Sequence, residues 1–414
     1  MAALKHFFKS DVTERSTTST GDNEVSNYTV TWADLTGAGF ANGDDVIVLI
    51  KFNYGGNSAA TNMTARFKQG STFAGAANLT QLYRVEPDNA TSGLGAREFL
   101  FLDRVTLATN DNFYLGIGTT SIEAARIEDW CFVILKLGDL AADDFRYAEA
   151  GSNAVTASPQ DGASVTLPSG GGDDWLVFGA VDWDVDSTTN DHRLRLSLNG
   201  ATSMEAQLEG EDAAEILGIG AIGYYPAAAS SAVCKLTYDA TSGTSAGTHL
   251  RSAIFALRME AFADHAGNQD ADAVAMGGVV DTYVETNTVS LSLSAAGPVA
   301  FFASTIADIT DTNHEPYHRV QVDGADIVSG LGRRGHAAYI GTDQLPLSSF
   351  GIASMSSGTR VIDVDSAEDR TATAYNFDEH ALVVFSLELA GGEPPGGTIL
   401  PQMMQHGLFL GMRT

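Results

Sequence analysis

The chain has 414 residues, 44% of them hydrophobic, with a net charge of −29. This hydrophobic content is sufficient for packed cores, while the acidic charge disfavours binding to nucleic acid phosphates. No stretch approaches 18 consecutive apolar residues, so we expect no membrane span. The first 20 residues lack the apolar segment of a signal peptide, so classical secretion is not expected.

In chain order, the first predicted strand is Tyr28 to Trp32, where Tyr28, Val30 and Trp32 alternate with threonines. Such alternation predicts a half-exposed strand. A longer pattern then occurs three times, ending at Gly70, Gly200 and Gly324. The copies read GDDVIVLIKFNYGGNSAATNMTARFKQG, GDDWLVFGAVDWDVDSTTNDHRLRLSLNG and GPVAFFASTIADITDTNHEPYHRVQVDG. Each predicts an apolar strand, a polar loop, an alternating strand and a glycine with the positive φ of a tight turn.

A second landmark follows each copy at a similar distance. It is a strongly apolar strand pattern at Phe132 to Leu137, Ile254 to Met259 and Val383 to Leu389. Two landmarks in the same order predict three copies of one β domain, joined like beads on a chain. The predicted domains are 1–145, 146–266 and 267–391, followed by a hinge and tail at 392–414. Residues 141–151 are expected to form a short link, with a helical turn as an option, and small polar residues at 263–273 indicate the second linker.

Each copy contains about seven or eight strand patterns, little helix and a turn signal roughly every ten residues. The predicted fold class is therefore all-β, with three tandem antiparallel β-sandwiches. The long loops between strands favour a jelly-roll-like arrangement over a minimal immunoglobulin domain.

Two motifs match catalytic signatures in unsuitable contexts. His314 and His318 form an H-E-x-x-H pattern, but Pro316 lies between them, and a proline inside a helix costs about 3 kcal/mol. Ser245 lies in a G-x-S-x-G pattern without the strand before it and helix after it that a nucleophile requires. We therefore predict no enzymatic activity, no catalytic residue and no cofactor.

Asp182, Asp184 and Asp186 alternate along one strand pattern, which would place three carboxylates on one face. A solvated strand edge is the simpler interpretation, and a bound cation stays open. No metal ligand is assigned. Cys131 and Cys234 lie in apolar patterns of different copies and are predicted to be buried free thiols.

The last 17 residues follow the hinge sequence GGEPPGG and are rich in large apolar side chains. Left in water they would form an unusual exposed patch, and they are too few to span a membrane. We expect them to anchor the chain in an assembly. The candidate contact residues are Ile399, Leu400, Met403, Met404, Leu408, Phe409, Leu410 and Met412.

The openings of the first two copies, RSTTST…YTVTW…DDVIVLI…ARFKQG and ASVTL…DDWLVFGAV…RLRLSLNG, carry a resemblance. The chain resembles tandem β-sandwich structural proteins of tailed bacteriophages, namely capsid-decorating, fibre and tail-associated proteins. The third copy departs from them, because Gly297-Pro298 replaces the Asp pair.

The resemblance implies a non-enzymatic virion protein, made in the host cytoplasm, that contacts other virion proteins and itself, with a trimer as one option. The alternative is a carbohydrate-binding or receptor-binding adhesion module with a host-surface glycan as partner. Exposed aromatic side chains would support the alternative, and the candidates are Trp183, Tyr224 and Tyr225.

Overall fold

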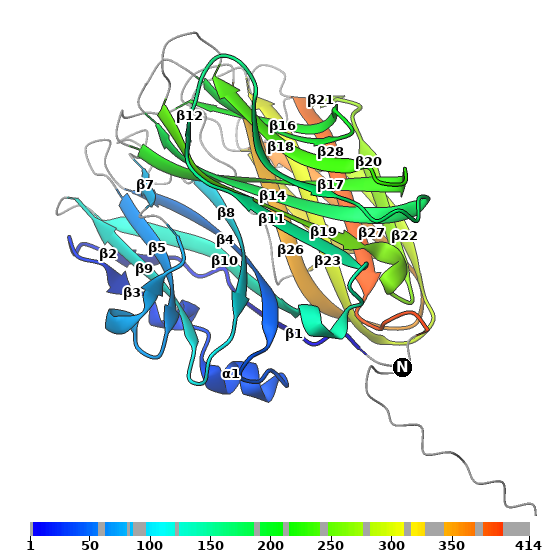
Figure 1. Cartoon of the computed structure of the whole chain (residues 1–414), viewed down its shortest axis with the longest axis horizontal. Helices are drawn as coiled ribbons and strands as arrows, with labels where there is room; N and C mark the ends of the chain where they lie inside the picture. The colour runs from blue at the N-terminus through cyan, green and yellow to red at the C-terminus, as the bar shows by residue number, and fades with distance from the viewer. Residues whose placement is uncertain are drawn as a thin grey trace, which may run out of the picture.

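The computed structural model describes residues 3–56, 63–80, 83–85, 97–120, 124–185, 191–209, 215–240, 247–275, 282–309, 316–327, 343–368 and 376–391. These residues form antiparallel strands almost throughout, and the strands group into three sandwiches that follow one another along the chain. Figure 1 shows sandwich 1 in blue to cyan, sandwich 2 in green and sandwich 3 in yellow to red, packed side by side.

The elements of the three sandwiches are as follows. Sandwich 1 contains β1 (His6–Asp11), β2 (Arg15–Thr17), β3 (Asn23–Glu24), η1 (Ser26–Tyr28), α1 (Trp32–Gly37), β4 (Asp45–Gly56), β5 (Met63–Gly70), η2 (Phe73–Gly75), β6 (Ala77–Asn78), β7 (Tyr83–Val85), β8 (Arg97–Thr106), β9 (Asn112–Thr119), β10 (Ala125–Lys136) and η3 (Leu137–Asp139). Sandwich 2 contains β11 (Phe145–Ala150), β12 (Asn153–Ala154), β13 (Gln160–Thr166), β14 (Asp173–Val185), β15 (Asp191–Leu198), β16 (Ala201–Glu209), β17 (Glu215–Ala228), β18 (Val233–Ala240), β19 (Gly247–Arg258) and η4 (Met259–Ala261). Sandwich 3 contains β20 (His265–Asp270), β21 (Val274–Ala275), β22 (Val284–Leu293), β23 (Gly297–Ile309), β24 (Pro316–Val322), β25 (Ala325–Asp326), β26 (Asp343–Met355), β27 (Gly358–Glu368) and β28 (Asn376–Ser386).

One strand order recurs in all three sandwiches. In sandwich 2 an inner sheet, β11-β19-β14-β17, faces an outer sheet, β13-β18-β15-β16. The inner sheets of sandwiches 1 and 3 are β1-β10-β4-β8 and β20-β28-β23-β26, and their outer sheets are β3-β9-β5-β7 and β22-β27-β24-β25. Eight main strands in two four-stranded sheets, with the first strand beside the last, form a jelly roll. The predicted fold class is confirmed.

Both sequence landmarks mark equivalent strands, but the closing glycines differ. Asn199-Gly200 and Asp323-Gly324 have positive φ at both residues, as a type I′ hairpin turn requires. Gly70 is not among the positive-φ residues, so that prediction is wrong there. Its need for glycine is steric, because a Cβ at Gly70 would lie 2.8 Å from the Cα of Ala76.

Three local predictions are wrong. Both predicted linkers contain a paired strand: β11 pairs with β19 and β20 pairs with β28, so each is the first strand of the next sandwich. The predicted strand at Tyr28 to Trp32 instead contains the end of η1 and the start of α1. Thr31 and Asp34 form a capping box there, which satisfies the backbone at the helix start.

The sandwiches are not beads on a chain. The outer sheet of sandwich 1 continues into the inner sheet of sandwich 2, because β7 pairs with β17. In the same way the outer sheet of sandwich 2 continues into the inner sheet of sandwich 3, because β16 pairs with β26.

Among the described residues, no helix has the length and apolar character needed to cross a membrane.

A common apolar core joins the inner sheets of all three sandwiches. Phe178 of sandwich 2 packs edge-on against Phe302 of sandwich 3, with ring centroids 5.0 Å apart. Other large side chains of this central core come from the same face of each inner sheet, among them Ile47, Leu49, Leu100, Leu102, Val133, Leu135, Leu176, Ile222, Phe255, Leu257, Phe350, Val383 and Phe385. Each inner sheet is therefore buried on both faces, against its own outer sheet and against the other two sandwiches.

Candidate functional site

Several predicted site residues lie outside the described residues. They are the whole tail with its eight anchor candidates, together with Asp186, Ser245 and His314. Their predicted roles stay predictions.

His318 lies within strand β24 and has no exposed surface. Burial lowers the pKa of its imidazole well below the usual value, and neither ring nitrogen has a hydrogen-bond partner in the described part of the chain. The zinc motif requires its two histidines on one face of a helix, whereas His318 lies in a strand. His318 is therefore a core side chain of sandwich 3.

The aromatic candidates for glycan binding are buried. Trp183 has no exposed surface, and Tyr224 and Tyr225 are each 5% exposed. Trp183 and Tyr225 belong to a second apolar core, drawn mostly from sandwiches 1 and 2, whereas Tyr224 belongs to the central core. None of the three can stack against a sugar from solvent.

Asp182 does not lie on a solvated edge, because β14 is flanked by β17 and β19. Its carboxylate is buried and accepts a hydrogen bond of 2.8 Å from the Tyr83 hydroxyl of sandwich 1. Burial raises the pKa of Asp182 to about 6. The carboxylate thus belongs to the boundary between two sandwiches.

The two cysteines are buried and form no disulfide, as predicted. The Cys131 thiol donates to the Phe350 carbonyl oxygen of sandwich 3 at 3.4 Å. Burial raises the pKa of both thiols, that of Cys234 to about 12, so neither thiolate is available as a nucleophile near neutral pH.

A partly buried charge network joins sandwiches 1 and 2. Arg251 on β19 donates to Asp103 Oδ1 at 2.9 Å and to Glu149 Oε1 at 3.0 Å. It also donates to the Leu102 carbonyl at 3.1 Å. Burial raises the pKa of Asp103 to about 6 despite the nearby guanidinium. The network fixes β8 of sandwich 1 against β11 and β19 of sandwich 2.

A buried ion pair of sandwich 1 binds the backbone of sandwich 3. Lys51 Nζ lies 3.0 Å from Glu98 Oε2, and the two side chains are 1% and 6% exposed. Both groups also bind the backbone of Ser348 on β26: Lys51 donates to its carbonyl, and its N–H donates to Glu98 at 3.0 Å. Removing either charge would leave the other buried without compensation.

Polar contacts also join sandwiches 2 and 3. Gln269 on β20 accepts a hydrogen bond from the Tyr224 N–H at 2.9 Å and donates to the Ser203 carbonyl at 3.2 Å. The Glu379 carboxylate accepts the Glu205 N–H, and burial raises the pKa of Glu379 to about 7. Every pair of sandwiches thus shares directed hydrogen bonds as well as apolar contact.

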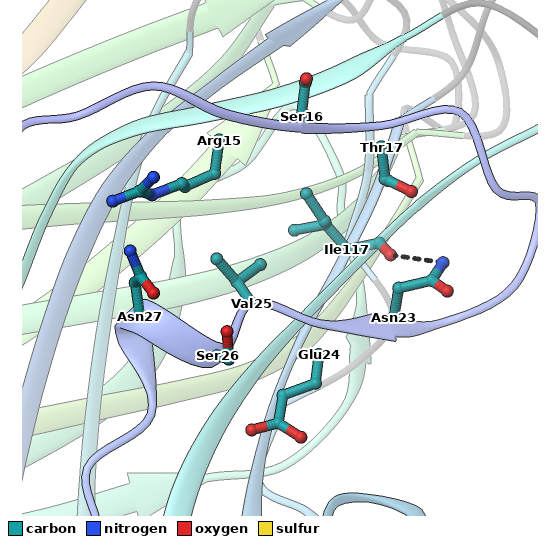
Figure 2. A pocket seen from close by; sticks show the side chains of 9 residues that line it. All are labelled: Arg15, Ser16, Thr17, Asn23, Glu24, Val25, Ser26, Asn27 and Ile117. Carbon is teal, nitrogen blue, oxygen red and sulfur yellow. Dashed lines mark hydrogen bonds between the residues drawn. The ribbon is translucent and has the colours of Figure 1, made fainter.

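A polar pocket of about 300 Å³ opens beside edge strand β3 of sandwich 1, and Figure 2 shows its lining. The lining residues are Arg15, Ser16, Thr17, Asn23, Glu24, Val25, Ser26, Asn27 and Ile117. Much of its polar surface is internally paired: Arg15 binds Asp11 at 3.0 Å and Asn23 donates to the Ile117 carbonyl at 3.3 Å. The amide and hydroxyl groups in the lining suit a small hydroxylated ligand.

Sequence reasoning missed the inter-sandwich residues, although one signal was present. Lys51 and Asp182 interrupt apolar strand patterns, at positions where a charge must find a buried partner. Their partners lie far away in the sequence, so the pattern indicates a buried contact without identifying it.

The sequence matches no protein-family model and no curated protein. Among solved structures, it is similar to a protein described under "The Triple Jelly Roll Fold and Turret Assembly in an Archaeal Virus", at 11% identity and a TM-score of 0.22, covering 84% of this chain and 81% of that chain. A PRD1 vertex protein is 13% identical over 28% of this chain and 98% of its own, with a TM-score of 0.22. A family 35 carbohydrate-binding module from Clostridium thermocellum is 8% identical over 26% of this chain and 90% of its own, with a TM-score of 0.18. Identities and TM-scores this low do not indicate a function for this chain. The jelly-roll assignment rests on the strand order itself.

Proposed function

We propose that this chain is a non-enzymatic structural protein of a tailed-bacteriophage virion, attached to the capsid or tail through protein–protein contacts. The observation that supports this role is the central core, which joins three jelly rolls into one block. The three sandwiches repeat one strand order around this core, so each contributes an outer sheet with the same arrangement of strands. Similar outer surfaces suit repeated contacts with symmetric neighbours.

The outer sheets supply surfaces compatible with this role. Their strands carry ion pairs in which a partly exposed arginine covers a buried or nearly buried aspartate, such as Arg193 with Asp239 at 2.8 Å and Arg319 with Asp365 at 2.9 Å. Charged faces keep a free subunit soluble before assembly and favour specific contacts over general adhesion. In this proposal the apolar tail at 392–414 fastens the block to another copy or to a different virion protein.

The direct test is to fractionate phage lysates and measure this chain by quantitative mass spectrometry. We expect it to sediment with intact particles at a fixed copy number. Recovery only in the supernatant, or a copy number that varies between preparations, would contradict a structural role.

A carbohydrate- or receptor-binding role is the second candidate, and the polar pocket beside β3 is the observation that favours it. A glycan array probed with the wild-type chain and with Ser26→Trp, which narrows the pocket, tests this role. Binding that the substitution abolishes would support it. If no glycan on the array binds the wild-type chain, the carbohydrate-binding role is contradicted.

A further inference from the structure

Three side chains of the kind that bind metal ions meet where sandwich 2 passes into sandwich 3. Asp174 is the second residue of β14, Glu260 lies in η4, and His265 begins β20. One donor atom of each lies within 4.8 Å of the other two. His265 Nε2 is 3.9 Å from Asp174 Oδ2 and 3.9 Å from Glu260 Oε1.

Neighbouring groups hold both carboxylates in place. Asp174 Oδ1 accepts the Ala227 N–H at 2.8 Å, and its Oδ2 accepts the Tyr224 hydroxyl at 2.5 Å. Glu260 Oε1 accepts the Asp174 N–H at 2.9 Å. The other oxygen of Glu260, Oε2, is buried and accepts no hydrogen bond from the described residues. Each carboxylate oxygen has two lone pairs, so coordinating capacity remains at both residues.

Sandwich 1 contains a matched site that differs in charge. Asp45 precedes the first core residue of β4 as Asp174 precedes that of β14, and Arg104 binds Asp45 through its Nε at 3.0 Å. In strand register, Arg104 lies opposite Ile47 on β4 and Tyr224 lies opposite the equivalent Leu176 on β14. Sandwich 2 therefore has a neutral phenol at the position where sandwich 1 has a guanidinium.

Sandwich 2 also places the carboxylate of this turn one position earlier, because the carboxylate of η3 is its third residue, Asp139, which accepts the Lys5 N–H at 2.9 Å. Glu260 is the second residue of η4, whereas the second residue of the equivalent η3 is Gly138. Within the described part of the chain, His265 is the one basic side chain in ion-pair range of Asp174 and Glu260. The nearby Arg258 is bound to Asp144 at 2.6 Å, with Asp173 at 3.6 Å. The site thus carries two carboxylates without a permanent cation of its own.

We propose that Asp174, Glu260 and His265 bind a divalent transition-metal cation. An imidazole together with two carboxylates suits Zn²⁺ or Mn²⁺, whereas Ca²⁺ and Mg²⁺ prefer oxygen ligands throughout. Tetrahedral ligand bonds of about 2.1 Å put donor atoms about 3.4 Å apart. His265 Nε2 would therefore move roughly half an ångström toward each carboxylate, and the two carboxylates, whose donor atoms lie within 4.8 Å of each other, would close by at most about 1.4 Å. Water completes the coordination shell. Because the ligands come from two sandwiches, the cation cross-links sandwich 2 to the first strand of sandwich 3.

The test uses the tag-free full-length chain, titrated with Zn²⁺ and with Mn²⁺ by calorimetry, and a thermal unfolding scan with and without each ion. We expect one ion per chain and a higher unfolding temperature when it is bound. His265→Gln and Glu260→Gln should each weaken binding at least tenfold. Asp45→Asn, the matched change in sandwich 1, should leave binding unchanged.

Co²⁺ offers a readout that is independent of stability, because its visible absorption reports nitrogen and oxygen coordination. We expect an absorption band that His265→Gln abolishes while the far-ultraviolet circular dichroism of the variant stays native. Two results would overturn the proposal: the wild-type chain takes up no stoichiometric ion, or uptake persists equally in His265→Gln and Glu260→Gln. The second result would identify general binding to surface carboxylates.

Discussion

The inner and outer sheets of each sandwich have the same number of main strands but bury different numbers of faces. Residues Val46 to Ile50 on inner strand β4 are all fully buried, with alternate side chains directed to the sandwich interior and to the central core. Outer strand β24 alternates between buried and half-buried residues instead. Continuous apolar runs thus mark the strands that pack on two sides, and alternation marks those that face solvent on one. The difference identifies the inner sheets as the part that unites the three sandwiches.

The largest expected effect comes from opening the central core. Phe302→Ala removes a fully buried ring that packs on Phe178, and should lower the free energy of unfolding by about 3–5 kcal/mol. Val361→Ala on outer strand β27 is the control, because Val361 is 41% exposed and should cost less than about 0.5 kcal/mol. Urea unfolding of both variants measures the difference. Equal costs would show that the inner faces do not stabilise the molecule more than the outer ones.

The buried Lys51–Glu98 pair of sandwich 1, which binds the Ser348 backbone of sandwich 3, tests whether the inner faces also depend on charge. Lys51→Met keeps the aliphatic packing but leaves Glu98 buried without its partner, so we expect a loss of about 3 kcal/mol at neutral pH. Adding Glu98→Leu should restore most of this loss. The control is Arg104→Met, whose pair with Asp45 is more than one-third exposed on both sides and should cost at most about 1 kcal/mol. If the two single variants unfold at the same urea concentration, the buried ion pair contributes no more to stability than the exposed one.

A smaller effect should appear in the pH dependence of stability. The pKa of Asp182 is about 6 in the folded protein against an ordinary value of 3.8, so its ionisation disfavours the folded state as the pH rises through this window. Asp182→Asn removes this dependence. Its stability relative to wild type should therefore be greater at pH 7 than at pH 4, by on the order of 2 kcal/mol.

Buried histidines act in the opposite direction over nearly the same range. Burial lowers the pKa values of His192 and His249 to about 4, so their protonation destabilises the fold as the pH falls. Both are present in wild type and variant, so their effect cancels in the difference. Asp143→Asn, an exposed change, serves as control. An identical pH profile for Asp182→Asn and wild type would refute the assignment.

The smallest effect on folding is expected from the tail. Truncation after Gly391 should change the unfolding free energy by less than about 0.5 kcal/mol, because we propose that 392–414 contacts a neighbouring chain and not its own sandwich. The same truncation should weaken oligomerisation or particle attachment, measured by analytical ultracentrifugation and co-sedimentation. A truncated chain that assembles normally, or that is less stable as a monomer, would show that the anchor hypothesis is wrong.

The sequence by itself determined the local features of each sandwich. Strand positions followed from apolar runs and alternation, and the turns at Asn199-Gly200 and Asp323-Gly324 followed from their residues. Recurrence of these signals was enough to predict three copies of one antiparallel sandwich. The helix start at Thr31 was also encoded locally, in the spacing of Thr31 and Asp34, but the neighbouring alternation concealed it.

Only the tertiary structure decided how the sandwiches meet. The pairing of β17 with β7, the contact of Phe178 with Phe302, and the meeting of Asp174 with His265 join residues about 90 to 130 positions apart. A strand's periodicity reports that a face is buried but carries no information about which distant surface covers it. Segments without a clear strand pattern, such as β11 and β20, become strands because an open sheet edge beside them supplies hydrogen bonds, and that edge exists only once the sandwich has folded.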